Sequence, residues 1–163
     1  MKRKKELKIV VLGSYNSGKT TTLETICEKK AKIEYKGTTI ALDYGNTIID
    51  GEKVHIFGYP GQERFEFMRE ILSQGLDGAI VVLDSSKGLT SVDEAIINKL
   101  NIQAVPYVLF ANKQDISTNI IEHHTIKPDT PIIPTVATSG HGVSEGLLTL
   151  IKMIKTSFDN FNN

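Results

Sequence analysis

Apolar runs alternate along the chain with segments of helical spacing, a pattern that predicts a layered α/β fold. Four short runs rich in β-branched residues have the composition of buried parallel strands: residues 7–12, 78–83, 105–111 and 132–136. Apolar residues recur at helical spacing over residues 21–30, 66–73, 91–100 and 143–158, and a short helix is expected around 119–124. Thr90 or Ser91 is expected to cap the helix over 91–100.

A hairpin is predicted between the first two of these helices. Asp50-Gly51 is a strong turn signal, and it separates two further strand-like runs, 39–49 and 53–57. These strands should pair antiparallel, with the first at the sheet edge, and the polar, lysine-rich residues 31–37 should form a connection before it. The prediction is therefore an α/β fold with a six-stranded, mostly parallel sheet, one antiparallel edge strand and helices on both faces.

The turn after the first apolar run carries a phosphate-binding pattern, G-x-x-x-x-G-K-[ST], between a strand and a helix. In that setting backbone N–H groups and the positive end of a helix face a polyphosphate. A chance match to the pattern would not be expected to lie between a strand and a helix. Lys19 would neutralise β- and γ-phosphate charge, and the Thr20 hydroxyl would bind magnesium. The residues expected to contact the nucleotide here are Gly13, Ser14, Tyr15, Asn16, Ser17, Gly18, Lys19, Thr20 and Thr21.

A second motif predicts which base is bound. The strand over 105–111 ends at Asn112-Lys113-Gln114-Asp115, the N-K-x-D element of GTP-binding proteins. The Asp115 carboxylate can accept hydrogen bonds from guanine N1–H and the exocyclic amine, whereas adenine would leave it unpaired. Lys113 would lie along one face of the base, and Asn112 would tie this loop to the phosphate-binding loop. Together the two motifs predict a guanine nucleotide site.

With these motifs in place, the chain resembles the Ras-like small GTPases, closest to the Arf branch and the prokaryotic Mgl-type GTPases, over residues 7–156. Residues 137–142 (ATSGHG) look like the A-T-S-G-x-G run of the Arf branch. The resemblance implies a P-loop NTPase G domain in which the Ala137 N–H meets guanine O6, with Thr138 beside it. Residues 59–65 (YPGQERF) look like switch II. There Gly61 would donate its N–H to the γ-phosphate, and Gln62 would orient the attacking water.

The resemblance also implies bound Mg²⁺, held by Thr20 and by a threonine of switch I. The spacing favours Thr39 for that role, and an ungapped alignment favours Thr38. The family's D-x-x-G motif is altered, because Gly58 stands where the aspartate belongs, and this should weaken the magnesium site. Asp43 is considered as a substitute only if its strand slides in the active state.

Composition narrows the function further. The chain has 163 residues, with 19 basic and 19 acidic ones, so one domain is expected and general attraction to nucleic acid is not. A single cysteine fits a reducing, cytoplasmic interior. A basic extension over residues 1–6, a tail over 159–163 and no lipidation motif predict weak or no direct membrane binding. No transition-metal site is expected, since the adjacent His123 and His124 would point to different faces of a helix.

Three functions are weighed. The leading hypothesis is a small monomeric GTPase switch, with Gln62 and Lys19 catalytic, that hydrolyses GTP slowly because residues 31–38 contain no arginine finger. It would act with protein regulators and effectors, including a roadblock-type activating partner. Gly58 instead favours a non-hydrolysing GTP-binding assembly module. An ATP-using kinase or ATPase is disfavoured by Asp115 and by the absence of a lid-like insertion.

Overall fold

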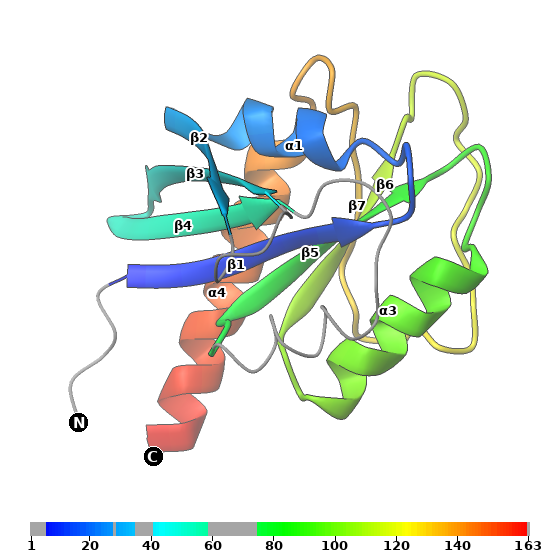
Figure 1. Ribbon diagram of the computed structural model, residues 1–163. Helices are drawn as coiled ribbons and strands as arrows, with labels where there is room; N and C mark the ends of the chain where they lie inside the picture. Colours follow the sequence, from blue (N-terminus) through cyan, green and yellow to red (C-terminus); the bar gives the residue numbers. More distant parts are fainter. Residues whose placement is uncertain (1–5, 28, 35–40, 59–74, 163) are drawn as a thin grey trace.

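The computed structural model describes residues 6–27, 29–34, 41–58 and 75–162 of the chain. They form one seven-stranded sheet in the order β2-β3-β4-β1-β5-β6-β7 (Figure 1). The strands are β1 (Glu6–Gly13), β2 (Lys29–Glu34), β3 (Ala41–Ile49), β4 (Glu52–Gly58), β5 (Gly78–Asp84), β6 (Tyr107–Asn112) and β7 (Ile132–Pro134). Strand β3 pairs antiparallel with both of its neighbours, and all other pairings are parallel. The predicted fold class, a mostly parallel sheet with one antiparallel strand, is confirmed.

The sheet has one strand more than expected, and its antiparallel strand is not at the edge. The prediction assigned residues 29 and 30 to the end of a helix and 31–37 to a connection. In the structure, residues 29–34 form strand β2, which pairs with β3. The segment Lys29–Glu34 is rich in charge, so it lacks the apolar signature of a buried strand. An edge strand needs only backbone pairing on one side, and charged residues are common there because they discourage further pairing.

Among the described residues, helices α1 (Lys19–Ile26) and α4 (Val143–Asn162) cover one face of the sheet and α3 (Ser91–Ile102) covers the other (Figure 1). Helices α1 and α4 pack over the face that carries Ile9, Val54 and Ile56. Helix α3 packs over the opposite face. The predicted inward stripe of α4 is buried: Leu147, Leu150, Ile151 and Ile154. Among the described residues, no helix is long and apolar enough to cross a membrane.

The start of α3 is fixed by a reciprocal cap. The Thr90 hydroxyl accepts a hydrogen bond from the Asp93 N–H at 3.2 Å, and the Asp93 carboxylate accepts one from the Thr90 N–H at 3.0 Å. This pattern satisfies backbone donors that the first turn of a helix leaves free. Thr90 is therefore the cap, one of the two residues expected.

The prediction of a short helix around 119–124 is wrong, because these residues form no helix. Polar side chains at and just before the start of the segment bond to a neighbouring loop instead. The Ser117 hydroxyl and the Asn119 amide donate to the Ser85 carbonyl at 3.3 and 3.4 Å. Such side-chain bonds to backbone compete with helix formation. The helix expected over 66–73 lies outside the described residues.

Candidate nucleotide-binding site

The phosphate-binding loop connects β1 to α1, and its backbone adopts conformations that favour glycine. Gly18 has φ 108° and Asn16 has φ 62°, both in the left-handed region. A Cβ on Gly13 would strike the Val82 carbonyl oxygen, and one on Gly18 would strike the Asn112 amide. The glycines of the motif therefore let the loop pass close to β5 and β6, where a larger residue would push it away.

Lys19 is buried at the first turn of α1, and its ammonium donates to the Gly13 carbonyl at 2.8 Å. The bond bends the side chain back over the loop. An open pocket lies against this turn, lined by Tyr15, Asn16, Gly18, Lys19, Thr20 and Thr21. Tyr15 is 72% exposed at its rim. A concave surface with a buried ammonium and the N-terminus of a helix can bind a polyphosphate.

Asn112, at the end of β6, ties three segments together. Its amide nitrogen donates to the Ser17 carbonyl at 2.9 Å, the tie to the phosphate-binding loop that the sequence predicted. Its oxygen accepts from the Thr135 hydroxyl and the Ala137 N–H, both at 3.0 Å. The Ala137 N–H is the group that the resemblance assigns to guanine O6. That role stays a prediction. Guanine O6 would have to share the Ala137 N–H with the Asn112 oxygen, to which it is already hydrogen-bonded.

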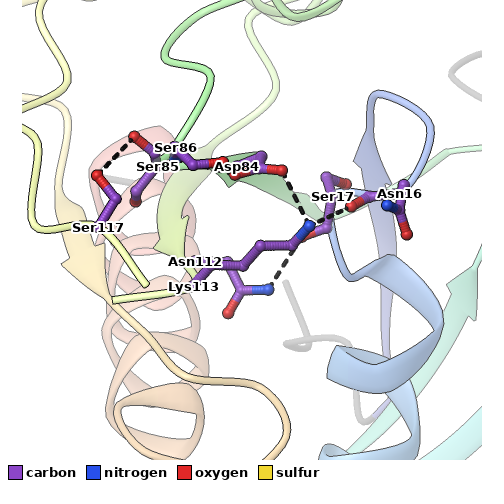
Figure 2. Close-up of polar contacts among 8 residues, drawn as sticks. All are labelled: Asn16, Ser17, Asp84, Ser85, Ser86, Asn112, Lys113 and Ser117. Atoms are coloured by element: carbon purple, nitrogen blue, oxygen red, sulfur yellow. Dashed lines mark hydrogen bonds and ion pairs between the residues drawn. The ribbon is translucent and has the colours of Figure 1, made fainter. Parts of the chain in front are cut away.

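Lys113 crosses from the N-K-x-D element to the phosphate-binding loop (Figure 2). Its ammonium donates to the Asn16 carbonyl at 2.8 Å and to the Asp84 carboxylate at 2.9 Å. Burial raises the pKa of Asp84, but hydrogen bonds from Ser86 and Lys113 outweigh it, and the pKa lies below its usual value. The Asp84–Lys113 pair is thus charged at neutral pH.

A second pocket adjoins the first on the side of the N-K-x-D element and shares Asn16, Gly18 and Thr21 with it. Its other lining residues are Asn112, Lys113, Asp115, Ile116, Val136, Ala137 and Thr138. Asp115 is exposed there, so its carboxylate is open to a ligand. The two pockets bring together most of the predicted phosphate and base residues of the described chain, whereas Gly13, Ser14 and Ser17 line neither pocket. Thr38, Thr39, Gly61 and Gln62 lie outside the described residues.

Sequence reasoning missed two acidic residues of the site. Asp84 is the last residue of a buried strand, as Asn112 is, and that position was the available signal. Asp93 is fully buried in α3 and accepts a hydrogen bond from the Ser14 N–H at 3.3 Å. Burial raises the pKa of Asp93 above its usual value, opposed by hydrogen bonds from Thr90 and Ser14. Asp93 therefore joins the cap of α3 to the phosphate-binding loop.

Two oxygen donors suited to Mg²⁺ are Thr20, which lines the first pocket, and Asp43 on β3. The Thr20 hydroxyl is exposed at the start of α1. Asp43 on β3 pairs directly with Gly58 on β4, and its Cβ lies 3.4 Å from the position of a Cβ on Gly58. The pairing places Asp43 beside Gly58 without any sliding of β3, and its role toward Mg²⁺ stays a prediction. Hydroxyl and carboxylate oxygens are ligands that Mg²⁺ prefers, so the donor set fits the ion.

Comparisons with known proteins agree with this geometry. Residues 8–113 match the family described as 50S ribosome-binding GTPase. The uncharacterized protein MJ1339 of Methanocaldococcus jannaschii is 52% identical over 70% of this chain and 74% of that protein. The mutual gliding-motility protein MglA of Myxococcus xanthus is 29% identical over 91% of this chain and 90% of its own. The G domain of the FeoB iron transporter of T. maritima has the same fold, with a TM-score of 0.74 at 19% identity, over 90% of this chain and 98% of that one.

The motifs, the joined pockets and the family match agree on one assignment. The chain belongs to the family described as 50S ribosome-binding GTPase and is a GTP-binding P-loop GTPase of the Ras-like small GTPase superfamily.

Proposed function

We propose that the protein is a switch that alternates between GTP- and GDP-bound states and hydrolyses GTP slowly. The observation that carries the proposal is the pair of bonds from Asn112 to Ser17 and from Lys113 to Asn16. They hold the base-binding element against the phosphate-binding loop, so one guanine nucleotide can occupy both pockets. The loop N–H groups, Lys19 and Thr20 would bind its phosphates, and Asp115 would select guanine.

Bound Mg²⁺ would neutralise charge on the β- and γ-phosphates. We assign Thr20, Thr39 and, through a water molecule, Asp43 to hold it. Asp43 would supply the carboxylate that Gly58 lacks, since the two residues are paired neighbours. Thr39 would contact the ion mainly when the γ-phosphate is present, so the segment around it would differ between the two states.

Hydrolysis would depend on Gln62, which would orient the attacking water, and on Lys19, which would stabilise charge in the transition state. Because residues 31–38 contain no arginine, the rate of the isolated protein should be on the order of 10⁻⁴ s⁻¹. A protein partner, which could be of the roadblock type, would raise that rate, and effectors would read the segments around Thr39 and Gln62. We assign the chain to one G domain acting as a monomer in the cytoplasm, a reducing compartment that fits a single, buried cysteine, Cys27.

A non-hydrolysing GTP-binding assembly module is the second candidate, favoured by Gly58 in place of the usual aspartate. Single-turnover release of phosphate from labelled GTP separates the two functions. Wild type and Gln62→Leu would be compared across a magnesium series, because the substitution removes the water-orienting group without changing charge. We expect hydrolysis by wild type alone, rising with Mg²⁺. Equal rates at every magnesium concentration, with no partner restoring the difference, would support the module.

A further inference from the structure

Three side chains with metal-binding atoms, none of which lines the nucleotide pockets, come together beside α3. Glu94 lies in the first turn of α3, and His123 and His124 lie in the segment between β6 and β7. When one ligand atom is taken from each of the three residues, these three atoms lie within 4.8 Å of one another. Nε2 of His123 is 3.7 Å from one Glu94 carboxylate oxygen, and Nε2 of His124 is 3.9 Å from the other.

The sequence argued against this arrangement, and the fold explains why that argument was wrong. Adjacent histidines diverge on a helix, but residues 119–124 form none. The two imidazole rings instead stack, with centroids 4.2 Å apart and an interplanar angle of 30°. Stacking lets both Nε2 atoms face the same carboxylate.

We propose that Glu94, His123 and His124 form a binding site for a divalent transition-metal ion, Zn²⁺ in particular. Two imidazole nitrogens and one carboxylate oxygen are a common zinc ligand set, with water in the fourth position. Bonds of about 2.0–2.2 Å in tetrahedral geometry place ligand atoms roughly 3.3–3.6 Å apart. The nitrogen–oxygen distances of 3.7 and 3.9 Å run to different Glu94 oxygens, and one ligand atom from each residue lies within 4.8 Å of the others. Closing these atoms onto one ion therefore needs movements of roughly 1 Å by exposed or half-buried side chains.

Neighbouring residues hold the ligands in place. Nδ1 of His123 lies 2.8 Å from the Thr125 hydroxyl and accepts a hydrogen bond from the Thr125 N–H at 3.2 Å, so the ring is oriented with Nε2 toward Glu94. Metal on Nε2 would place the proton on Nδ1. The Thr125 N–H would then give up its bond to Nδ1, and the Nδ1–H would donate to the Thr125 hydroxyl, the second bond that metal-binding histidines usually make. The Asn101 amide of α3 donates to the Thr125 carbonyl at 3.3 Å, which fastens the histidine segment to the helix that carries Glu94.

The competing explanation is a pair of ion pairs between protonated histidines and Glu94. Protonated imidazole cannot bind a metal, so an alkaline buffer of about pH 8 favours metal binding over the ion pairs. The test therefore uses the full chain without a polyhistidine tag at that pH, stripped of metal with a chelator and then loaded with GDP and excess Mg²⁺. Co²⁺ absorption in the visible range reports the geometry, and Zn²⁺ competition against a chromophoric chelator reports the affinity.

We expect one equivalent of Co²⁺ with the intense absorption of a tetrahedral site, displaced by Zn²⁺. His123→Ala, His124→Ala and Glu94→Ala should each weaken binding at least tenfold. His124 is 81% exposed, so its variant tests the site without threatening the fold. His141→Ala removes an exposed imidazole, and Glu122→Ala removes an exposed carboxylate beside His123 that is not part of the cluster; both should bind as wild type does. Uptake by wild type no greater than by His124→Ala, or equal losses in the two controls, would overturn the proposal.

Discussion

The Lys113 ammonium lies 2.9 Å from the Asp84 carboxylate, and this ion pair joins the ends of β5 and β6 beneath the base pocket. The Asp84 side chain is 4% exposed, so water screens the pair little. Because the same ammonium also donates to the Asn16 carbonyl, Asp84 acts through Lys113 on the phosphate-binding loop. Asp84 is therefore a positioning residue for the nucleotide.

Asp84→Asn should weaken GDP and GTP binding about tenfold without changing base preference. The amide keeps the shape of the side chain but removes the charge that holds Lys113, a loss of about 1–3 kcal/mol. Nucleotide affinity would be measured by titration with a fluorescent GDP analogue. Asp129→Asn, an exposed carboxylate before β7, is the matched control and should bind as wild type does. An unchanged nucleotide affinity for Asp84→Asn would mean that the Asp84 charge is not needed to hold Lys113 in place.

The same carboxylate predicts a pH dependence of stability. The folded-state pKa of Asp84 lies below its usual value of 3.8, so ionised Asp84 stabilises the fold above that pH. This contribution is lost as the pH falls through the lower, folded-state pKa. Urea unfolding of wild type and Asp84→Asn should therefore show a stability difference at pH 7 that shrinks below about pH 4. A difference that stays constant into acid would contradict the assigned direction.

Two substitutions separate the roles of the α3 cap. Thr90→Ala removes the capping hydroxyl and should cost about 1 kcal/mol of unfolding free energy while leaving nucleotide affinity unchanged. Asp93→Ala should lower both, because it also leaves the Ser14 N–H without its acceptor. Thermal unfolding and GDP titration on both variants are the measurements. Equal GDP affinities in the two variants would show that the Asp93–Ser14 bond does not support the loop.

Asp43→Asn should raise the magnesium concentration needed for tight GTP binding several-fold. Gly58→Asp in that background should restore it, since φ at Gly58 is outside the left-handed region and the nearest obstacle is the flexible end of Leu23, 2.9 Å from the new Cβ. Magnesium titrations at fixed GTP give the comparison, with Asp50→Asn in the β3–β4 turn as control. If Asp43→Asn behaves as that control does, another group replaces the missing aspartate.

Sequence reasoning succeeded where a function depends on a short contiguous motif. The tie from Asn112 to the phosphate-binding loop follows from a tetrapeptide at the end of a buried strand. The bonds from Lys113 to Asn16 and Asp84 were not predicted, because the motif placed Lys113 against the base. Asp93 was missed as a partner of the loop because it lies 79 residues from Ser14, and only the packing of α3 beside β1 brings them together. Strand β2 was missed because its sequence is rich in charged residues. An edge strand needs only backbone pairing on one side, so it does not require the apolar run that identifies a buried strand.

Asp115→Asn should shift preference from guanine to xanthine. An amide can donate to the carbonyl that xanthine carries where guanine has its amine, whereas it repels the guanine amine. Competition of GTP and XTP for the fluorescent GDP analogue measures the change. Gln114→Ala, beside it in the same loop, should keep guanine preference. Retained guanine preference in Asp115→Asn would remove Asp115 from base recognition.

The central claim is that the joined pockets bind one guanine nucleotide. Displacement of the fluorescent GDP analogue from wild type by GTP and by ATP tests it most directly, with Lys19→Ala as the variant expected to lose nucleotide binding. GTP should compete with an affinity at least about 10⁴-fold above that of ATP, because adenine would leave the Asp115 carboxylate unpaired. Equal displacement by ATP and GTP would contradict the account.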